Sequence, residues 1–368
     1  MTDQLYTELA KLIHTWGVEL GFQQIGITDT EPGDHEHHLK RWLEQGFQGE
    51  MKYMSRHGSK RSRPAELIPG TLRIISVRMD YLPADSRIPE TLGAREIGYV
   101  SRYALGRDYH KVLRSRLKKL ADKIGSFLVD HKIEEFAARV FTDSAPVLEK
   151  ALAEKSGLGW IGKNTLLLNK DAGSWFFLGE IFTNIPLPIN QHQVANLCGS
   201  CTACIDICPT QAIVAPYQLD ARLCISYQTI ENRGEIPEGL RSLMGNRIFG
   251  CDDCQAVCPW NRYARTTSEG DFKPRHGLED SELLELFAWS EEEFLRKTEG
   301  SAIRRTGYSG WLRNISVALG NADYDASIVT ALKQKLDKVN EMVAGHIDWA
   351  IRQQRAKSMP HYLKKCSL

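Results

Sequence analysis

Apolar side chains recur at helical spacing near both ends of the chain. Residues three and four positions apart fall on one face of a helix, so such a stripe indicates a face that packs against a core. A capping-box sequence, Ser290-Glu-Glu-Glu293, opens one further short helix. The C-terminal helices follow one another closely, as in helical-hairpin (HEAT-like) repeats. The striped segments are 5–16, 110–124, 311–319, 328–336 and 343–351.

Continuous apolar runs between turn residues predict strands in the first half of the chain. Such runs occupy 72–79, 97–103 and 137–142. The segment 164–183 has the pattern of a hairpin, with its turn at 171–173. Strands mixed with helices in one half and helices alone in the other predict an α+β fold with a mixed sheet.

Composition limits the class of protein. The 368 residues, of which 42% are apolar and 25% charged, are typical of a folded chain with two or three domains. No apolar run approaches the ~20 residues of a membrane span, and the N-terminal segment lacks the apolar region of a signal peptide. A net charge of +1 gives no chain-wide attraction to nucleic acid, so any such binding depends on local patches. We expect a cytoplasmic protein with no membrane partner.

Eight of the nine cysteines lie between Cys198 and Cys258, and the ninth is Cys366. Because the cytosol keeps thiols reduced, such a cluster indicates metal binding rather than disulfides. The first four follow the spacing C-x2-C-x2-C-x3-C-P of bacterial two-cluster ferredoxins, in which the fourth cysteine ligates the other cluster. We therefore predict two [4Fe–4S] clusters, held by Cys198, Cys201, Cys204 and Cys258 and by Cys208, Cys224, Cys251 and Cys254.

Two alternatives to this assignment stay open in the sequence. One keeps both clusters but groups the cysteines without the exchange. The other places zinc at the cysteine pairs, although closely spaced cysteines that end in Cys-Pro twice fit zinc sites poorly. Cys366 is expected to be an ordinary surface thiol. We expect the cluster module at 191–262, between a domain at 1–190 and a helical region at 263–368.

The sequence contains no P-loop. The segment Gly157-Leu-Gly159-Trp-Ile-Gly162 has the spacing G-x-G-x-x-G, but it precedes a strand instead of following one, which is the wrong order for a dinucleotide-binding motif. The glycine-rich segment 157–164 precedes a strand, so it is either a tight loop near a bulky ligand or a plain turn. A corrinoid is one of the few reactive centres left for such a domain beside low-potential clusters. Asp108-Tyr-His110 matches only the start of the corrinoid signature D-x-H-x-x-G, because Leu113 replaces the glycine. We therefore expect His110 to be a cap or a surface group and not a cobalt ligand.

The sequence as a whole resembles the epoxyqueuosine reductase family, from residue 5 to about residue 355. Besides the cysteines, the resemblance is carried by segments that are specific in combination. These are 61–64 (RSRP), 67–70 (LIPG), 101–110 (SRYALGRDYH), 143–146 (DSAP), 157–164 (GLGWIGKN), 224–227 (CISY), 300–305 (GSAIRR) and 311–314 (WLRN).

This resemblance implies a reductase that converts epoxyqueuosine to queuosine at the wobble position of a tRNA anticodon stem-loop. It implies base-off cobalamin beside one of two clusters, which an external low-potential donor reduces. Removal of the epoxide oxygen needs a proton donor, and the resemblance assigns this role to Asp143. From the residues alone, a cap before a helix at 147–154 is the better interpretation of Asp143. We expect burial beside the corrin to favour its acid form, and we expect a monomer.

Polar side chains within the matched segments are the predicted contacts of the corrin. These are Arg61, Tyr103, Asp143, Lys163, Asn164, Ser174, Ser226 and Tyr227. Arginine suits the phosphates and splayed bases of an anticodon loop. The predicted tRNA contacts are Asn232, Arg233, Arg262, Arg265, Arg304, Arg305 and Arg313. The basic face of the helix at 110–124 is interpreted as solvated surface, with phosphate contact as the alternative.

Other functions share parts of this pattern. A reductase like the reductive dehalogenases, which the family resembles in fold and cofactor, would need no tRNA-facing tail. A two-cluster electron carrier would need neither Asp143 nor the large first domain. In a helical RNA-binding protein the clusters would be structural only.

Overall fold

A four-stranded sheet forms the centre of the N-terminal half in the computed structural model, which describes residues 2–190 and 194–358. The strand order is β1-β2-β7-β4, and all three pairings are antiparallel. The strand predictions at 72–79 and 137–142 are confirmed by β2 and β4. The strands are β1 (Gln24–Thr28), β2 (Arg73–Asp80), β4 (Ala138–Phe141) and β7 (Phe176–Thr183).

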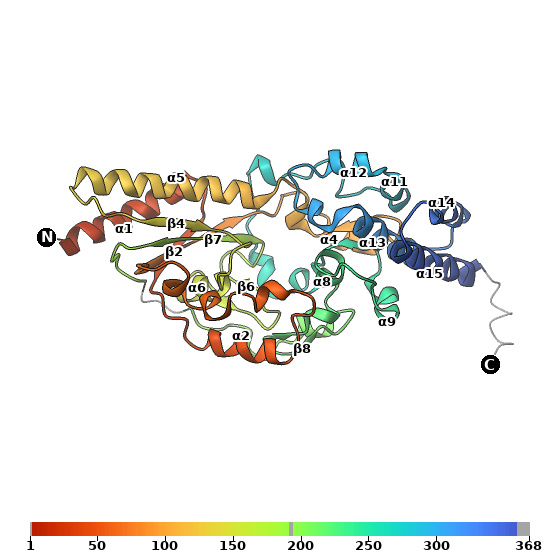
Figure 1. Ribbon diagram of the computed structural model, residues 1–368, viewed down its shortest axis with the longest axis horizontal. Helices are drawn as coiled ribbons and strands as arrows, with labels where there is room; N and C mark the ends of the chain where they lie inside the picture. Colours follow the sequence, from red (N-terminus) through yellow and green to blue (C-terminus); the bar gives the residue numbers. More distant parts are fainter. Residues whose placement is uncertain (1, 191–193, 359–368) are drawn as a thin grey trace.

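One face of this sheet is covered by two long helices, α1 (Thr2–Glu19) and α5 (Tyr109–Asp130), which lie along it in Figure 1. Alternate residues of β2 and β7, such as Val77 and Ile181, meet Ile13 of α1 and Leu117 of α5 in one buried cluster. Both helices confirm their predicted stripes. The helix α5 extends beyond 124 because Leu128 continues the buried face.

The opposite face of the sheet is partly polar. The short helix α6 (Glu149–Lys155) packs on β2 and β7 through Leu152, together with Val147 just before the helix. In the same face, Ser76 of β2 lies directly opposite Glu180 of β7, and both are fully buried. This face of the sheet therefore carries buried polar groups, whereas the face covered by α1 and α5 is apolar.

Two strand predictions are wrong in part. The segment 164–183 is not one hairpin: β6 (Leu167–Leu168) pairs with β5 (Trp160–Ile161), whereas β7 enters the main sheet. Only the tight turn remains, where Asn169 and Gly173 exchange backbone hydrogen bonds. Of 97–103, only the two residues of β3 (Tyr99–Val100) form a strand, because the parallel partner β10 (Arg247–Phe249) is itself only three residues long.

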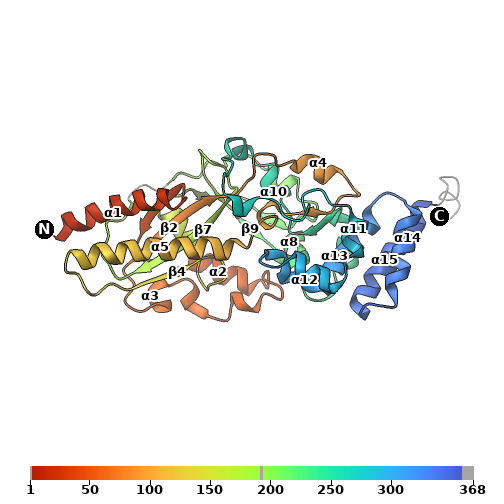
Figure 2. The same cartoon turned by 90° about the horizontal axis from the view of Figure 1, so that it is seen from above.

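The C-terminal helices confirm the predicted stripes. The helices α13 (Gly307–Asn321), α14 (Ala326–Leu336) and α15 (Glu341–Ser358) pack together around Ile315, Leu332 and Ile347. They lie at the end of the molecule opposite to α1 (Figure 2). Before them come α11 (Leu283–Ala288) and α12 (Glu291–Lys297), and α12 begins with the predicted capping box.

The C-terminal core also contains a segment from between the cysteines. Ile225, Ile248 and Phe249 share one buried cluster with Trp311 and Ile315. The segment comprises α8 (Ile225–Ile230), α9 (Glu238–Arg241) and β10. The predicted module at 191–262 therefore contributes an insert to the helical core, and the three boundaries themselves stay predictions.

The remaining elements are short and connect these layers. The α+β class is confirmed by the sheet and the helical tail. None of the helices in the described residues combines the length and the hydropathy that a membrane span requires. The short elements are α2 (His35–Glu44), α3 (Pro64–Leu67), α4 (Ile88–Gly93), α7 (Ala203–Asp206), β8 (Ile213–Ala215), β9 (Gln218–Leu219) and α10 (Asp253–Ala256).

Candidate active site

A large cavity lies where the N-terminal domain meets the C-terminal helices. It has a volume of about 640 Å³, and its walls include Asp143, Cys224 and Arg304. A second cavity of about 770 Å³ adjoins it and is bordered by α2 and α6. Four residues line both cavities and form the wall that the two share: Tyr53, Asp143, Leu219 and Arg305.

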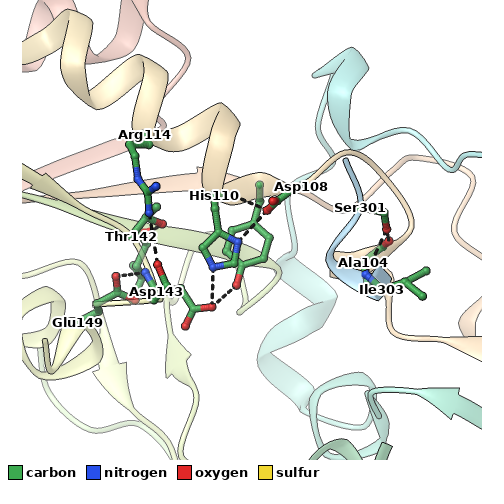
Figure 3. Close-up of polar contacts among 12 residues, drawn as sticks. Ala104, Asp108, His110, Arg114, Thr142, Asp143, Glu149, Ser301 and Ile303 are labelled. Atoms are coloured by element: carbon green, nitrogen blue, oxygen red, sulfur yellow. Dashed lines mark hydrogen bonds and ion pairs between the residues drawn. The ribbon is translucent and has the colours of Figure 1, made fainter. Parts of the chain in front are cut away.

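Asp143 projects from the loop after β4 to the junction of the two cavities. Its φ angle is +51°, a left-handed conformation that aspartate and asparagine tolerate better than most residues. Its Oδ2 accepts hydrogen bonds from the Tyr109 hydroxyl and from Nε2 of His110, the latter at 3.1 Å (Figure 3). The carboxyl is 51% exposed, so a substrate in the cavity can reach it.

His110 sits in the first turn of α5, where Asp108 is the N-cap. The Asp108 carboxylate accepts from the backbone nitrogen of His110 at 3.1 Å and lies 2.7 Å from its Nδ1. Burial lowers the pKa of His110, but the hydrogen bonds with Asp108 and Asp143 outweigh burial and raise it to about 9. At neutral pH the ring is therefore an imidazolium held between two carboxylates.

The same contacts correct the expected protonation of Asp143. Burial alone would raise the pKa of its carboxyl, as predicted, but the hydrogen bonds from His110 and Tyr109 outweigh burial and bring it below the ordinary value. Asp143 is therefore ionised beside a protonated His110. The proton that an acid catalyst needs is stored on the imidazole of this pair, within reach of the cavity.

The cysteines are gathered in two groups. A separate cavity of about 220 Å³ is lined by Cys198, Cys201, Cys204 and Cys258. In the second group, burial raises the pKa of the Cys224 and Cys254 thiols. The charge of nearby Cys208 raises the pKa of both further, and that of Cys224 raises the pKa of Cys254. This arrangement supports the exchanged grouping of ligands. Cys366 lies outside the described residues.

The residues predicted to contact a corrin fall into two sets. Arg61, Tyr103, Asp143, Ser226 and Tyr227 line one or both of the large cavities. The other three line neither cavity, and their contact with a corrin stays a prediction. Lys163 donates to the carbonyl oxygens of Gly199 and Cys201, Asn164 donates to that of Cys254, and Ser174 bonds Asn261. These side chains hold the cysteine loops in place.

The residues predicted to contact tRNA are also divided. Arg304 and Arg305 line the first cavity, and exposed Arg233 donates to the carbonyl oxygen of Thr306 beside them. Arg262 lines the cluster cavity instead, and Arg265 donates to the backbone of Asp171. Arg233, Arg304 and Arg305 form a basic rim at one opening of the site, which we call the arginine rim.

Arg313 and Asn232 do not fit the predicted tRNA track. Arg313 is only 1% exposed and donates to the carbonyl oxygens of Gln228, Asn232 and Gly234, so it cannot meet a phosphate. The side chain of Asn232 bonds Gln228 and the backbone of Glu235. Both residues instead fasten the insert between the cysteines to α13.

We expect Arg313→Ala to lower the free energy of unfolding by about 3 kcal/mol or more, because each buried carbonyl left without a donor costs ~1–3 kcal/mol. Urea unfolding of the iron-loaded protein measures this loss. Arg304→Ala is the control, and a surface change of this kind stays within ~0.5 kcal/mol. Equal stability of the two variants would contradict the structural role of Arg313.

Sequence reasoning missed several polar residues of the site. Tyr109 and Glu149 contact Asp143, and Glu180 lies behind Glu149. Tyr109 and His110 come from α5, whereas Glu180 comes from β7, so only the folded chain brings them together. The one local signal was a glutamate inside the apolar run 176–183, where a charged residue is unexpected without a partner.

Comparison with known protein families agrees with this arrangement. The model described as "4Fe-4S double cluster binding domain" matches residues 197–261. The model described as "Epoxyqueuosine reductase QueG, DUF1730" matches residues 61–144, which end beside the site at Ser144. The double-cluster domain and a cavity that carries an acid–base pair define an iron–sulfur oxidoreductase.

Curated relatives cover almost the whole chain. The epoxyqueuosine reductase of Pseudomonas aeruginosa is 61% identical over 344 residues, which are 94% of this chain and 94% of the relative. The Escherichia coli enzyme is 59% identical over 347 residues, 94% of this chain and 90% of the relative. The chain belongs to the epoxyqueuosine reductase family.

Solved structures share the fold. One is an epoxyqueuosine reductase from Bacillus subtilis with its catalytic aspartate loop swung out of the active site, at a TM-score of 0.84 and 29% identity over 98% of this chain and 93% of that one. Another is an epoxyqueuosine reductase with an epoxyqueuosine-modified tRNA stem loop, at a TM-score of 0.82 and 27% identity over 95% of this chain and 100% of that one.

Proposed function

We propose that this chain reduces epoxyqueuosine to queuosine at the wobble position of tRNA. The observation that carries the proposal is that Asp143 and Cys224 line the same cavity. One belongs to an acid–base pair and the other to the predicted ligands of a cluster. The reaction consumes two electrons and two protons, converts the epoxide to an alkene, and releases the oxygen as water.

The large cavities suit cobalamin as the cofactor. Their volumes lie within the ~300–1,000 Å³ usual for bound organic ligands, and the two cavities are adjacent. Buried Arg61 lines the second one, and its Nε has no partner among the described residues, as an amide or phosphate of the cofactor would provide. Tyr103, Ser226 and Tyr227 would hold the cofactor from the first cavity. The chemistry that cobalamin supplies when bound is a low-potential, nucleophilic cobalt centre.

The protein supplies the proton. The imidazolium of His110 keeps a proton next to the Asp143 carboxylate, which faces the cavity. Both ring nitrogens of His110 are engaged by carboxylates, which supports the prediction that it is not a cobalt ligand. Asp143 positions this proton where the epoxide oxygen develops negative charge.

Electrons would enter through the first cluster and leave through the second. Cys201, in the first group, is exposed, whereas Cys224, in the second, borders the reaction cavity. The first cluster would accept electrons from an external low-potential donor and pass them inward. We expect the protein to act as a monomer in the cytoplasm, where thiols stay reduced.

The arginine rim is where we place the anticodon stem-loop. A relative in the family has been crystallised with such a stem loop, and Arg304 and Arg305 are exposed at the cavity that contains Asp143. Phosphates at this opening would leave the wobble base beside the acid–base pair. The base would enter the cavity while the loop stays outside.

We expect Arg304→Ala combined with Arg305→Ala to weaken tRNA binding and to reduce the salt dependence of log K by about 1 for each arginine. Filter binding of substrate tRNA at several salt concentrations measures both effects. Iron content stays unchanged, because neither residue contacts a cysteine loop. Arg352→Ala, an exposed arginine on α15, is the control. Unchanged salt dependence in the double variant would contradict the binding of tRNA at the arginine rim.

The proposed function is tested by anaerobic incubation of iron-loaded protein with cobalamin, a reductant and epoxyqueuosine-containing tRNA. Mass analysis of the nucleosides then shows whether queuosine forms. A corrin absorption band that co-purifies with the clusters supports the cofactor. Cluster absorption without any bound corrin, and no queuosine, would leave a two-cluster electron carrier.

A further inference from the structure

A pair of buried carboxyl groups lies behind Asp143. Glu180 of β7 is 0% exposed, and both its carboxyl oxygens lack a conventional hydrogen-bond donor among the described residues. Glu149, the first residue of α6, lines the second cavity and accepts a hydrogen bond from the backbone nitrogen of Asp143 (Figure 3). The two glutamate side chains are within hydrogen-bonding distance of each other.

Two ionised carboxylates cannot share this position. A hydrogen bond between two carboxyl groups requires a proton on one of them. Burial, followed by the negative charge of Asp143, raises the pKa of Glu149 to about 8. Burial and the charge of Glu149 raise the pKa of Glu180 as well. The pair therefore holds a proton at neutral pH.

The charges around the pair do not compensate a second negative charge. Lys150, the neighbour of Glu149 on α6, donates to the carbonyl oxygen of Thr165. His110 from α5 neutralises Asp143 first, because its Nε2 lies 3.1 Å from that carboxylate. The strand β2 contributes only the hydroxyl of Ser76, which lacks a partner among the described residues.

The position of the two glutamates indicates that they do more than fill space in the core. Glu180 is surrounded by apolar residues of the same sheet face, among them Phe141 and Phe182. A buried carboxyl in such a wall costs free energy that an apolar residue would not. Glu149, in contrast, reaches the cavity, so the buried proton has an exit on the side of Asp143.

We propose that Glu149 and Glu180 share a proton and deliver it, through Glu149, to the oxygen released from the epoxide, as the second of the two protons that the reaction consumes. The His110–Asp143 pair gives the first. In this step the O–H bond of Glu149 breaks, a new O–H bond completes the departing water, and a proton from cavity water restores the pair. The two electrons come from the clusters, so the proposal adds no further reductant. The catalytic part rests on the proposed function.

A substrate-free measurement tests the shared proton by itself. Infrared spectra of the iron-loaded protein at pH 7 are expected to contain the C=O band of a protonated carboxyl, which disappears as the pH rises through about 8. The band is expected to be lost only when both residues are replaced, in Glu149→Gln combined with Glu180→Gln, because burial still raises the pKa of the carboxyl that each single variant retains. Glu154→Gln, on the same helix, is the matched control and keeps the band.

Turnover measures the catalytic part. We expect Glu149→Gln to lower kcat on the order of 100-fold, the lower range for loss of a proton donor, with KM for tRNA unchanged. In Glu180→Gln, burial and the charge of Asp143 still raise the pKa of Glu149, so the fall of kcat at high pH is not expected to move to lower pH. Glu149→Asp is expected to recover part of the activity.

Each result has a distinct meaning. Absence of the carboxyl band at pH 7 in the unaltered protein overturns the shared proton, whatever the activity. A band that behaves as expected, with normal kcat in Glu149→Gln, overturns the delivery step. If no protein forms queuosine but the band is present, the proposed function fails while the pair stands. Should Glu180→Gln not fold, the spectrum of the unaltered protein decides the shared proton and the kcat of Glu149→Gln decides the delivery step.

Discussion

Replacing Asp143 by Asn is expected to slow reduction of the epoxide at least ~100-fold, with iron and cobalamin content unchanged. The amide keeps the left-handed backbone at this position, because asparagine tolerates it as aspartate does. It cannot, however, balance the charge of the His110 imidazolium. The pKa of His110, raised to about 9 by Asp108 and Asp143, is therefore expected to fall, so that less of the stored proton is held at neutral pH.

The direction of the change in the pKa of His110 can be measured without turnover. A group whose pKa is raised holds its proton below that value, so the His110 ring should titrate near pH 9 in the unaltered protein and at lower pH in Asp143→Asn. Proton NMR of the imidazole follows both. Asp171→Asn, in the tight turn after β6, is the control. Near-normal turnover by Asp143→Asn would return Asp143 to a structural role and leave Tyr103 or a bound water as the proton source.

Loss of a cluster ligand is the second change with a large expected effect. Cys224→Ala should remove about four of ~8 irons per chain and abolish turnover, because this cysteine borders the reaction cavity. Cys258→Ala should remove the other cluster, the one whose cavity also contains Cys198. Iron analysis and electron paramagnetic resonance of the reduced protein distinguish the two clusters.

The two cysteine variants also decide the grouping of ligands. In the exchanged grouping, Cys258→Ala leaves the signal of the cluster beside the reaction cavity intact. In the unexchanged grouping it removes that signal and spares the cluster of Cys198. Cys366→Ala is the control and should keep all iron. Loss of iron in Cys366→Ala, with none in Cys224→Ala, would contradict the ligand assignment.

Local sequence patterns predicted the elements that depend on local interactions. The stripe of α5 and the capping box of α12 are complete within one stretch of chain, so spacing alone revealed them. The strand at 176–183 was recognised, but its partner was not. Its apolar run fits any buried position in a sheet, and β2, about a hundred residues earlier, supplies the pairing.

The candidate site shows the same division. The spacing of the cysteines predicts their role as ligands, and Asp143 was identified through the family resemblance. Burial was expected to set the pKa of Asp143, but the result depends on His110, which lies 33 residues earlier in the chain. The sequence did not predict the Glu149–Glu180 pair or the burial of Arg313. Both likewise depend on contacts between elements that no single segment encodes.

The insert that joins the helical core also bears on how the iron–sulfur protein is assembled in the cell. A nascent chain that has just passed Cys258 already contains all eight clustered cysteines. Its β10, however, which precedes Cys251, still lacks the neighbour α13 on which it packs. The geometry of the second set of ligands is therefore completed only after synthesis has passed Asn321. The second cluster is therefore expected to be inserted only after α13 has folded against β10.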